Sequence, residues 1–231
     1  MSTVKKKPGF TIVRDFERAD ADSIALFSGL ASANVSDVQG RQNTLDYRIK
    51  PIYHPMPQLL GTALTVKARP GDNMVAFKAI EMAQPGDVIV VAGSFESTLS
   101  VWGGIMSGMA KKKGIAGLVT DSLVRDVNQI REFDFPTFAT GLTPTGPTKE
   151  GSGEINTPVS CGGVVVMPGD IILGDEDGVV VIRKEEARDV HQRVLDRIEL
   201  ENSWLERIER GELFLMDSDE DLQARGATFL D

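Results

Sequence analysis

The amino-acid sequence predicts an α/β fold with a parallel sheet, in one domain that carries helical segments at both ends. Two short apolar runs, 88–92 and 115–119, alternate with stretches at helical spacing, which is the pattern of stacked βαβ units. From 159 to 182, apolar runs are separated only by Gly, Pro and Asp turns, which indicates strands. The chain has 231 residues, 41% of them apolar, so it can bury one substantial core.

The first elements are helical and then switch to strand and helix. Apolar residues near helical spacing predict a helix over 21–30, and Ser36-Asp37 is a candidate N-cap for a second short helix. A strand over 63–66 leads through the turn Pro70-Gly71-Asp72-Asn73 into a helix over 75–82. We expect this stretch to be the first βα unit of the sheet.

The same alternation continues through the middle of the chain. In order, we expect a strand buried on both faces, a helix that stops at Gly114, a second strand, a short helix and a third strand: 88–92, 105–109, 115–119, 127–130 and 136–138. Strands joined in this way are parallel, and their crossovers are right-handed by default.

The last part of the domain is all strand, and a helix follows it. The expected strands centre on 159, 164–167, 171–173 and 179–182. Beyond about 185, Val190, Val194 and Ile198 recur at intervals of four, which predicts an amphipathic helix. We therefore expect an N-terminal extension over 1–20, the main domain over 21–190, and a C-terminal helix with an acidic tail over 191–231.

The charge pattern argues against a nucleic-acid groove as the main working surface, so we expect no nucleic-acid partner. The formal net charge is −9, whereas phosphate binding relies on clustered Lys and Arg. The cluster Lys111-Lys112-Lys113 ends a predicted helix, where cations complement the helix dipole. From Glu199 to Asp221 there are nine Asp or Glu and two Arg, a solvated helical face or a surface for a basic protein partner.

The sequence also bears on where the protein works. No apolar run is long enough to span a bilayer, and the N-terminus MSTVKKKPGF has no apolar stretch behind its basic residues. The single cysteine, Cys161, cannot form an internal disulfide, which fits a reducing compartment. We expect a cytoplasmic protein that does not bind membranes.

One constellation could carry chemistry, and it runs from Gly103-Gly104 to Arg125 and Asp126. Two glycines at the mouth of a helix allow close backbone approach, and the N–H groups of the first turn can bind a carboxylate or phosphate. Arg125 and Asp126 fall just after the next strand, so a helix N-terminus, a cation and a carboxylate converge at one crevice. This predicts an anion pocket with a metal ligand beside it.

The same stretch resembles the RraA-like family, which includes 4-hydroxy-4-methyl-2-oxoglutarate/4-carboxy-4-hydroxy-2-oxoadipate aldolases and inhibitor-like regulators of ribonuclease E. Its pattern G-[DG]-h-h…G-h-x-G-h-h-x-D-[GS]-h-h-R-D, with h an apolar residue, fits from Gly103 to Asp126. Twenty residues lie between Gly104 and Arg125, as in the family signature. Further similarity lies in the turns at 70–73 and 85–87 and in the stretch 168–178, so the resemblance covers roughly 20–190, most of the chain.

The resemblance implies a swivelling β/β/α-type fold and a homotrimer or homohexamer with sites between subunits. It implies that Arg125 binds the pyruvoyl end of a small 2-oxo acid, that Asp126 holds Mg²⁺ or Mn²⁺, and that the amides of Ile105 and Met106 bind the substrate carboxylate. The implied activity is that of a metal-dependent lyase working through a pyruvate enolate. The alternative is a non-catalytic regulator or scaffold that binds a basic partner.

Two positions depart from the family pattern. Many family aldolases carry an acid where this chain has Gly104, and members with glycine there place an acid where this chain has Gln129. That acid helps to remove the proton of the substrate's C4 hydroxyl. We therefore expect measurable oxaloacetate decarboxylation, which needs no such base, with weak aldol cleavage that Gly104→Asp partly recovers.

Several other residues have a structural explanation beside a functional one. Asp121, Asp72 and Asn73 could each orient a site or cap a turn. The run Asp175-Glu176-Asp177-Gly178 resembles half a calcium loop but lacks the later Glu, so we expect a strand-connecting turn. His54, His191 and Cys161 lie in no nucleophile motif, and no Walker or dinucleotide motif is present.

Overall fold

The structure is a computed structural model that describes residues 9–212 and 218–230. It divides into two compact units, of which the first ends at Val194 and the second begins at Leu195. The first unit contains the sheets and most of the helices, and the second contains the rest of the long C-terminal helix and one short helix.

Four parallel strands form the centre of the main sheet: β3 (Leu59–Ala68), β4 (Asp87–Ala92), β6 (Gly117–Thr120) and β8 (Thr137–Ala139). The remaining strands extend the sheet at its edges: β1 (Phe10–Ile12), β2 (Lys50–Pro51), β10 (Gly153–Ile155), β13 (Ile171–Asp175) and β14 (Gly178–Ile182). The order along the main path is β1-β10-β3-β4-β6-β8-β2, and β13 pairs antiparallel with β3. The predicted parallel βαβ core is confirmed.

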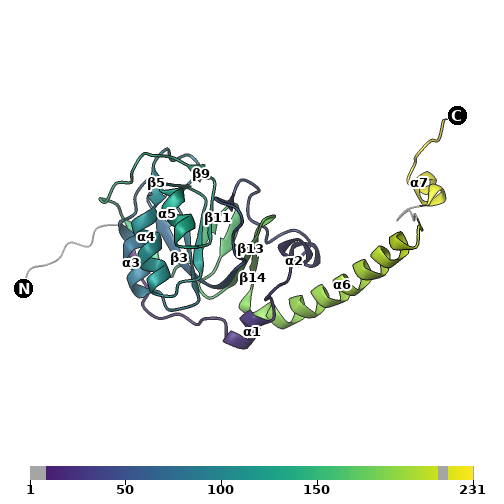
Figure 1. Cartoon of the computed structure of the whole chain (residues 1–231), viewed down its shortest axis with the longest axis horizontal. Helices are drawn as coiled ribbons and strands as arrows, with labels where there is room; N and C mark the ends of the chain where they lie inside the picture. Colours follow the sequence, from purple (N-terminus) through teal and green to yellow (C-terminus); the bar gives the residue numbers. More distant parts are fainter. Residues whose placement is uncertain (1–8, 213–217, 231) are drawn as a thin grey trace, which may run out of the picture. The chain divides into compact units, whose positions relative to one another are not determined.

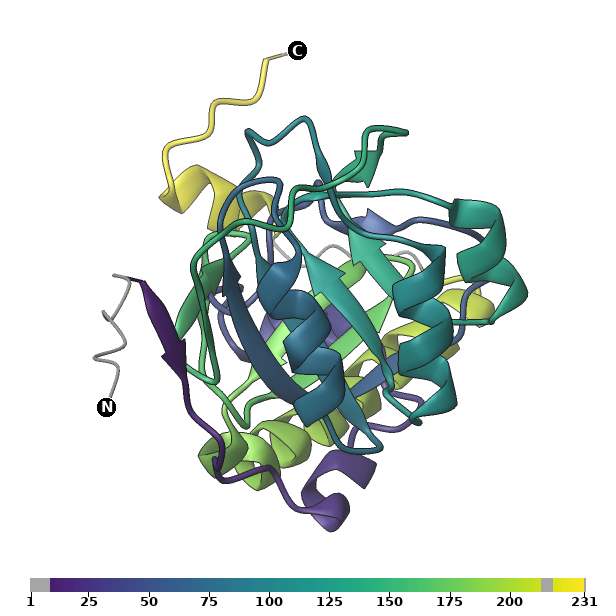
Figure 2. The same ribbon diagram turned by 90° about the vertical axis from the view of Figure 1, so that its left-hand side faces the viewer.

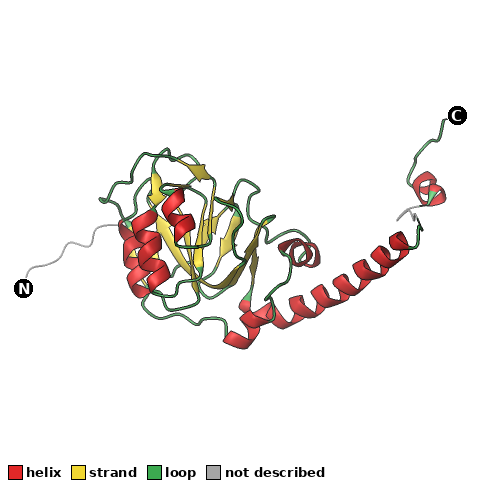
Figure 3. Ribbon diagram, in the orientation of Figure 1, coloured by secondary structure: helices red, strands yellow, loops and turns green. Residues whose placement is uncertain are grey.

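Three helices cover one face of this sheet: α3 (Met74–Met82), α4 (Gly104–Lys112) and α5 (Val127–Glu132). Figures 2 and 3 show them lying side by side against the strands. Leu64 and Val66 of β3 and Ile89 and Val91 of β4 point into the core beneath these helices. They alternate with residues of the opposite face, as side chains of a strand must.

The other face of the sheet packs against more β-structure. The hairpin of β11 (Val159–Cys161) and β12 (Val164–Val166) lies there, and apolar side chains of the hairpin and of β14 form a second core with Ala63, Val88 and Val90. Both cores contain many fully buried Val, Leu and Ile side chains, each worth about 1.5 to 3 kcal/mol on burial. The layers are therefore strands, sheet and helices, which is the expected β/β/α arrangement.

A small parallel sheet stands apart from the main one and carries the candidate site. It consists of β5 (Ser100–Trp102), β7 (Leu123–Val124) and β9 (Gly141–Leu142), in that order. Figure 1 labels β5 and β9 at the upper end of the first unit, near α5. None of these three strands was among the elements that the sequence predicted.

The remaining helices are α1 (Ala21–Ala25), α2 (Ser32–Val38), the 3-10 turn η1 (Lys184–Glu186), α6 (Ala187–Glu209) and α7 (Asp219–Ala224). The helix expected over 21–30 ends at Ala25 and continues as turns. Ser36-Asp37 lies inside α2, so the N-cap prediction was wrong. The first residue of α2, Ser32, is instead bonded to a carboxylate far along the chain. Asp175 accepts hydrogen bonds from the N–H and hydroxyl of Ser32 at 2.7 and 2.6 Å.

The C-terminal helix α6 confirms the four-residue spacing of its first turns, since Val190 and Val194 are buried. Part of the predicted acidic tail, residues 213–217, lies outside the described residues. Within the described ranges, no helix is both long enough and apolar enough to cross a membrane. The domain boundaries expected from the sequence stay a prediction.

Candidate functional site

The site begins where β5 turns into α4. Gly103 is the N-cap of α4, and a Cβ at this position would lie 2.7 Å from Oδ2 of Asp126. A larger residue at position 103 would therefore have to displace the Asp126 carboxylate, which approaches the glycine backbone closely. The first turn of the helix leaves the N–H groups of Ile105 and Met106 without an intrahelical acceptor, which makes this end attractive to anions.

Arg125 and Asp126 occupy the equivalent turn after β7. Because β5 and β7 are parallel neighbours, their following turns lie at the same edge, and the Arg125 N–H donates to the Trp102 carbonyl at 3.1 Å. Asp126 adopts the left-handed conformation, with φ 63° and ψ 38°, which costs roughly 1 to 3 kcal/mol and persists only where the surrounding structure enforces it. The structure thus brings the predicted glycine pair and the predicted Arg-Asp pair together.

The Asp126 carboxylate faces α4 and does not cap its own helix. Asp126 is the N-cap residue of α5 but makes no side-chain cap hydrogen bond. Its Oδ2 accepts the Gly104 N–H at 3.0 Å and lies 3.5 Å from Nε of Arg125. The Asp126 carboxylate is therefore bonded to the start of α4 and not to the N–H groups of α5.

A cavity of about 210 Å³ opens beside these groups. Its wall includes Trp102, Gly103, Ile105, Met106, Arg125 and Asp126, together with residues that the sequence did not single out as ligand-binding. The Trp102 indole is buried, donates to the Ser107 hydroxyl at 2.8 Å and stacks on Phe135. The Trp102 side chain in the cavity wall is therefore held by both a hydrogen bond and ring stacking.

Asn73 and Lys149 complete the cavity from distant parts of the chain. Asn73 is 4% exposed and donates from Nδ2 to the Met106 sulfur at 3.3 Å, while its buried Oδ1 has no hydrogen-bond partner in the described chain. Nζ of Lys149 lies 5.2 Å from the centre of the Phe77 ring, in cation–π range. The sequence makes Asn73 a candidate for orienting a site, but nothing in the spacing points to Lys149.

The charges around the cavity favour an anionic ligand. Arg125 and Lys149 bring two cations against the single carboxylate of Asp126, and the α4 N-terminus adds partial positive charge. A Cβ on Gly146 would lie 2.9 Å from Nη1 of Arg125, so the loop before Lys149 packs directly on the guanidinium. Such a site can hold a carboxylate and stabilise negative charge that develops on a neighbouring oxygen.

The donor set fits a divalent cation only in an open form. Among the residues that the structure describes, no group of three or more His, Cys, Asp or Glu side chains is placed to enclose a metal. The Asp126 side chain is 40% exposed, and its second oxygen carries no hydrogen bond within the described ranges. Mg²⁺ commonly keeps several waters and uses one or two carboxylates plus substrate oxygens, so Asp126 can serve as its single protein anchor.

A second cavity, of about 490 Å³, shares Arg125 and Asp126 with the first in its wall. Besides this pair, its wall carries only uncharged side chains: Val127, Asn128, Gln129, Leu142, Thr143 and Pro144. Gln129 fills the space beside Gly104, because a Cβ on Gly104 would lie 2.0 Å from Oε1 of Gln129. The space beside Gly104, the position where many family aldolases carry an acid, is therefore occupied by the neutral amide of Gln129.

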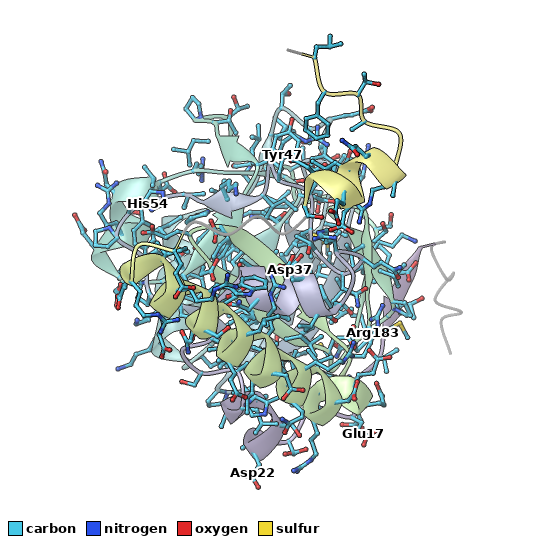
Figure 4. All side chains as sticks on the ribbon, turned by 90° about the vertical axis from the view of Figure 1, so that its right-hand side faces the viewer. Glu17, Asp22, Asp37, Tyr47, His54 and Arg183 are labelled. Carbon is cyan, nitrogen blue, oxygen red and sulfur yellow. The ribbon has the colours of Figure 1, made fainter. Side chains whose placement is uncertain are left out.

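The other candidates from the sequence have structural roles. Asp121 is buried and caps the neighbouring strand end, accepting the N–H groups of Gly93 and Ser94 at 2.8 and 3.1 Å. The run 175–178 is the turn between β13 and β14, as expected. Cys161 is fully buried, and burial raises the pKa of its thiol well above the usual range. His54 lies on the exposed surface (Figure 4). Its Nδ1 is 3.5 Å from a carboxylate oxygen of Glu176.

The sequence and the fold both have recognisable relatives. The family model RraA-like, described as Aldolase/RraA, matches residues 13–181. A Halalkalibacterium halodurans protein, provisionally named a 4-hydroxy-4-methyl-2-oxoglutarate aldolase, is 40% identical over 76% of this chain and 83% of its own length. The 4-hydroxy-4-methyl-2-oxoglutarate aldolase of Thermus thermophilus is 36% identical over 48% of this chain and 68% of its own.

Among solved structures, RraAS2 of Streptomyces coelicolor superposes with a TM-score of 0.71 and 27% identity. The match covers 82% of this chain and all of that one, which is described as an unusual member of the RNase ES inhibitor RraA protein family. This chain is thus similar in sequence to relatives named as aldolases and similar in fold to a structure named as an RraA protein. The chain belongs to the RraA-like family.

Proposed function

We propose that this protein is a metal-dependent lyase that acts on short 2-oxo acids. The observation that carries the proposal is the convergence of the α4 N-terminus, Arg125 and Asp126 on one cavity. A 2-oxo acid presents a carboxylate and an adjacent carbonyl, which match a helix N-terminus and a cation respectively. The aldolase names of its relatives support the same class of reaction.

The residues divide the work between binding and charge stabilisation. The amides of Ile105 and Met106 hold the substrate carboxylate, and Arg125 stabilises the negative charge that develops on the carbonyl oxygen as the C–C bond breaks. Lys149 pairs with a carboxylate at the far end of a dicarboxylic substrate, and the free Asn73 Oδ1 accepts a hydrogen bond from the ligand or its water. Asp126 anchors Mg²⁺ or Mn²⁺, which supplies Lewis-acid polarisation of the substrate oxygens when bound.

The neutral pair Gly104 and Gln129 determines which reaction is favoured. Aldol cleavage requires a base that removes a hydroxyl proton, and no carboxylate stands at either position. Oxaloacetate decarboxylation starts from a carboxylate that is already ionised, so it requires mainly charge stabilisation. We infer that decarboxylation is the stronger activity of this protein.

The test is a screen of 2-oxo acids with Mg²⁺ or Mn²⁺ and pyruvate detection. Wild type is expected to release pyruvate from oxaloacetate above the metal-only background, and Asp126→Ala is expected to lose that rate. Glu132→Ala is the matched control, since Glu132 is an exposed carboxylate on the same helix. An Asp126→Ala rate near that of wild type would rule out the assignment.

A non-catalytic regulator is the second candidate. It is favoured by the loss of both acids at Gly104 and Gln129 and by the acidic C-terminal segment, which could meet a basic partner. A titration with Mn²⁺ in the presence and absence of oxalate separates the two functions. Binding of neither ligand would support the regulator.

We further propose a homotrimer or a dimer of trimers. Ile105 and Met109, on α4 beside the cavity, are 75% and 47% exposed, and Phe133 after α5 is 41% exposed. Apolar groups gathered near a site are typical of an interface between subunits. Light scattering should give a multiple of three chains, whereas a mass of 25.1 kDa at micromolar concentration would refute the assembly.

A further inference from the structure

Asp72, in the turn between β3 and α3, is a buried carboxylate that the proposed reaction does not use. It is 0% exposed. Its Oδ1 accepts the Met74 N–H at 2.9 Å, and its Oδ2 accepts the Thr148 hydroxyl and the N–H groups of Glu150 and Gly151 at 2.7, 2.7 and 2.9 Å. Three of these four donors belong to one segment, which begins 76 residues later in the chain.

That segment carries Lys149 between two of the donors. Residues 149–152 belong to no helix or strand, so they depend on side-chain contacts for their conformation. Apart from the bonds to Asp72, the segment is tied to the turn by Thr148 N–H to Gly71 at 2.8 Å and Asn73 N–H to Thr148 at 3.1 Å. The conformation of the Lys149 backbone is therefore set from both sides by bonds that end on Asp72 or its neighbours.

Gly151 has the backbone space that this contact requires. A Cβ on Gly151 would lie 2.8 Å from Cγ of Asp72. Such a distance is shorter than real Cβ contacts, so any larger residue would push the segment away from the carboxylate. The close approach of segment 148–151 to the turn thus depends on two residues, the carboxylate of Asp72 and the glycine at position 151.

Asp72 is suited to a fixed charge and unsuited to proton transfer. Burial by itself raises the pKa of Asp72, but the donated hydrogen bonds outweigh it and hold the pKa below its ordinary value. The side chain is not among those that line the cavity. A carboxylate whose oxygens already accept four hydrogen bonds has little capacity left to act as a base toward a ligand.

We propose that Asp72 is a positioning residue, whose carboxylate clamps segment 148–151 onto the start of α3 and thereby holds Lys149 at the wall of the cavity. The inference rests on the proposed function, in which Lys149 pairs with the far carboxylate of the substrate. A lysine has a long stem with many rotamers, so its use as a fixed cation depends on a fixed backbone. Loss of the clamp weakens substrate binding more than it slows the chemical step.

The kinetic test uses Asp72→Asn, Lys149→Met and the double variant, with oxaloacetate and Mn²⁺. Because hydrogen bonds to a charged group are lost, Asp72→Asn should raise KM by roughly tenfold with little change in kcat. Added to Lys149→Met, it should raise KM no further. Asp121→Asn is the matched control, since it also neutralises a buried carboxylate bonded to backbone N–H groups but should leave KM unchanged.

A second measurement reports the clamp without any ligand. Trypsin cleavage after Lys149, followed by mass spectrometry, should be roughly tenfold faster in Asp72→Asn, because the segment opens more often. Cleavage after Lys112 is the internal reference. If Asp72→Asn does not fold, Thr148→Val removes one of the four bonds and should shift KM and cleavage in the same direction by less.

The outcomes separate the two proposals. A wild-type KM and a wild-type cleavage rate in Asp72→Asn, or losses that add fully to those of Lys149→Met, would overturn the clamp. If wild type does not turn over oxaloacetate at all, the proposed function fails. The clamp is then decided by the trypsin experiment alone, where faster cleavage supports it and an unchanged rate overturns it.

Discussion

Placing an acid at position 104 tests how the neutral pair Gly104 and Gln129 limits the chemistry. A Cβ added to Gly104 would lie 2.0 Å from Oε1 of Gln129 and 3.0 Å from both Cβ and Cδ of Gln129. The amide end can rotate away, but the Gln129 Cβ is fixed to α5. Forcing such a contact typically costs about 1 to 3 kcal/mol. Gly104→Asp alone should therefore recover less activity than the double variant Gly104→Asp/Gln129→Ala.

The expected gain follows from what a positioned acid or base contributes, about 10²- to 10⁴-fold. We expect the double variant to cleave 4-hydroxy-4-methyl-2-oxoglutarate at least roughly tenfold faster than wild type, because a new carboxylate gains only part of that range. Pyruvate release is measured with this substrate and with oxaloacetate, and Gln129→Ala alone is the control. Decarboxylation should change little, since it does not need the base.

A wild type that already cleaves the aldol as fast as the double variant would refute this reasoning. Another base would then have to serve. Asp72 is not available, because it is buried and its carboxylate already accepts four hydrogen bonds. Glu96 is exposed and does not line the cavity.

Three further predictions concern single residues. Arg125→Lys should lower kcat/KM for oxaloacetate by roughly 10²- to 10³-fold in steady-state assays, because lysine lacks the planar guanidinium that spans the developing charge; a rate near wild type would contradict this. The native Cys161 thiol should resist alkylation, and since its folded pKa is raised, its contribution to stability should be lost as pH rises above its unfolded pKa of about 8.5. A thermal melting temperature that rises over that range in wild type but not in Cys161→Ala would be the opposite result. The folded pKa of Asp72 is lowered, so the stabilisation by its carboxylate is present above its unfolded pKa of about 3.9 and is lost as pH falls through the folded pKa. In Asp72→Asn the melting temperature should therefore fall less steeply as pH is lowered below about 3.9. An unchanged slope of melting temperature against pH would count against this prediction.

The parts of the fold that periodicity predicts are those with a strong local signal. The helix expected over 75–82 is α3, and the run 88–92 lies within β4, which is buried as expected. Both are set by apolar side chains within one element. Strands of two or three residues, such as β7 and β9, have too few side chains to show a period, and their pairing depends on distant segments.

The candidate site divides in the same way. Arg125 and Asp126 could be predicted, because the glycine pair marks the start of one helix and Arg125-Asp126 follows the end of the next predicted strand. Lys149 could not, because its segment is joined to a turn 76 residues earlier by three hydrogen bonds that Asp72 accepts. The left-handed conformation of Asp126 also has no local signal, since tertiary contacts enforce it.

The most direct test of the metal assignment is a Mn²⁺ titration that follows the free-ion electron paramagnetic resonance signal, with and without oxalate. Asp126→Asn keeps the shape of the side chain and removes its charge, and Glu132→Gln removes a charge from the exposed surface of the same helix. We predict that wild type and Glu132→Gln bind Mn²⁺, more tightly with oxalate, and that Asp126→Asn does not. Binding of Mn²⁺ by Asp126→Asn as tight as that of wild type would contradict the assignment of Asp126 as the metal ligand.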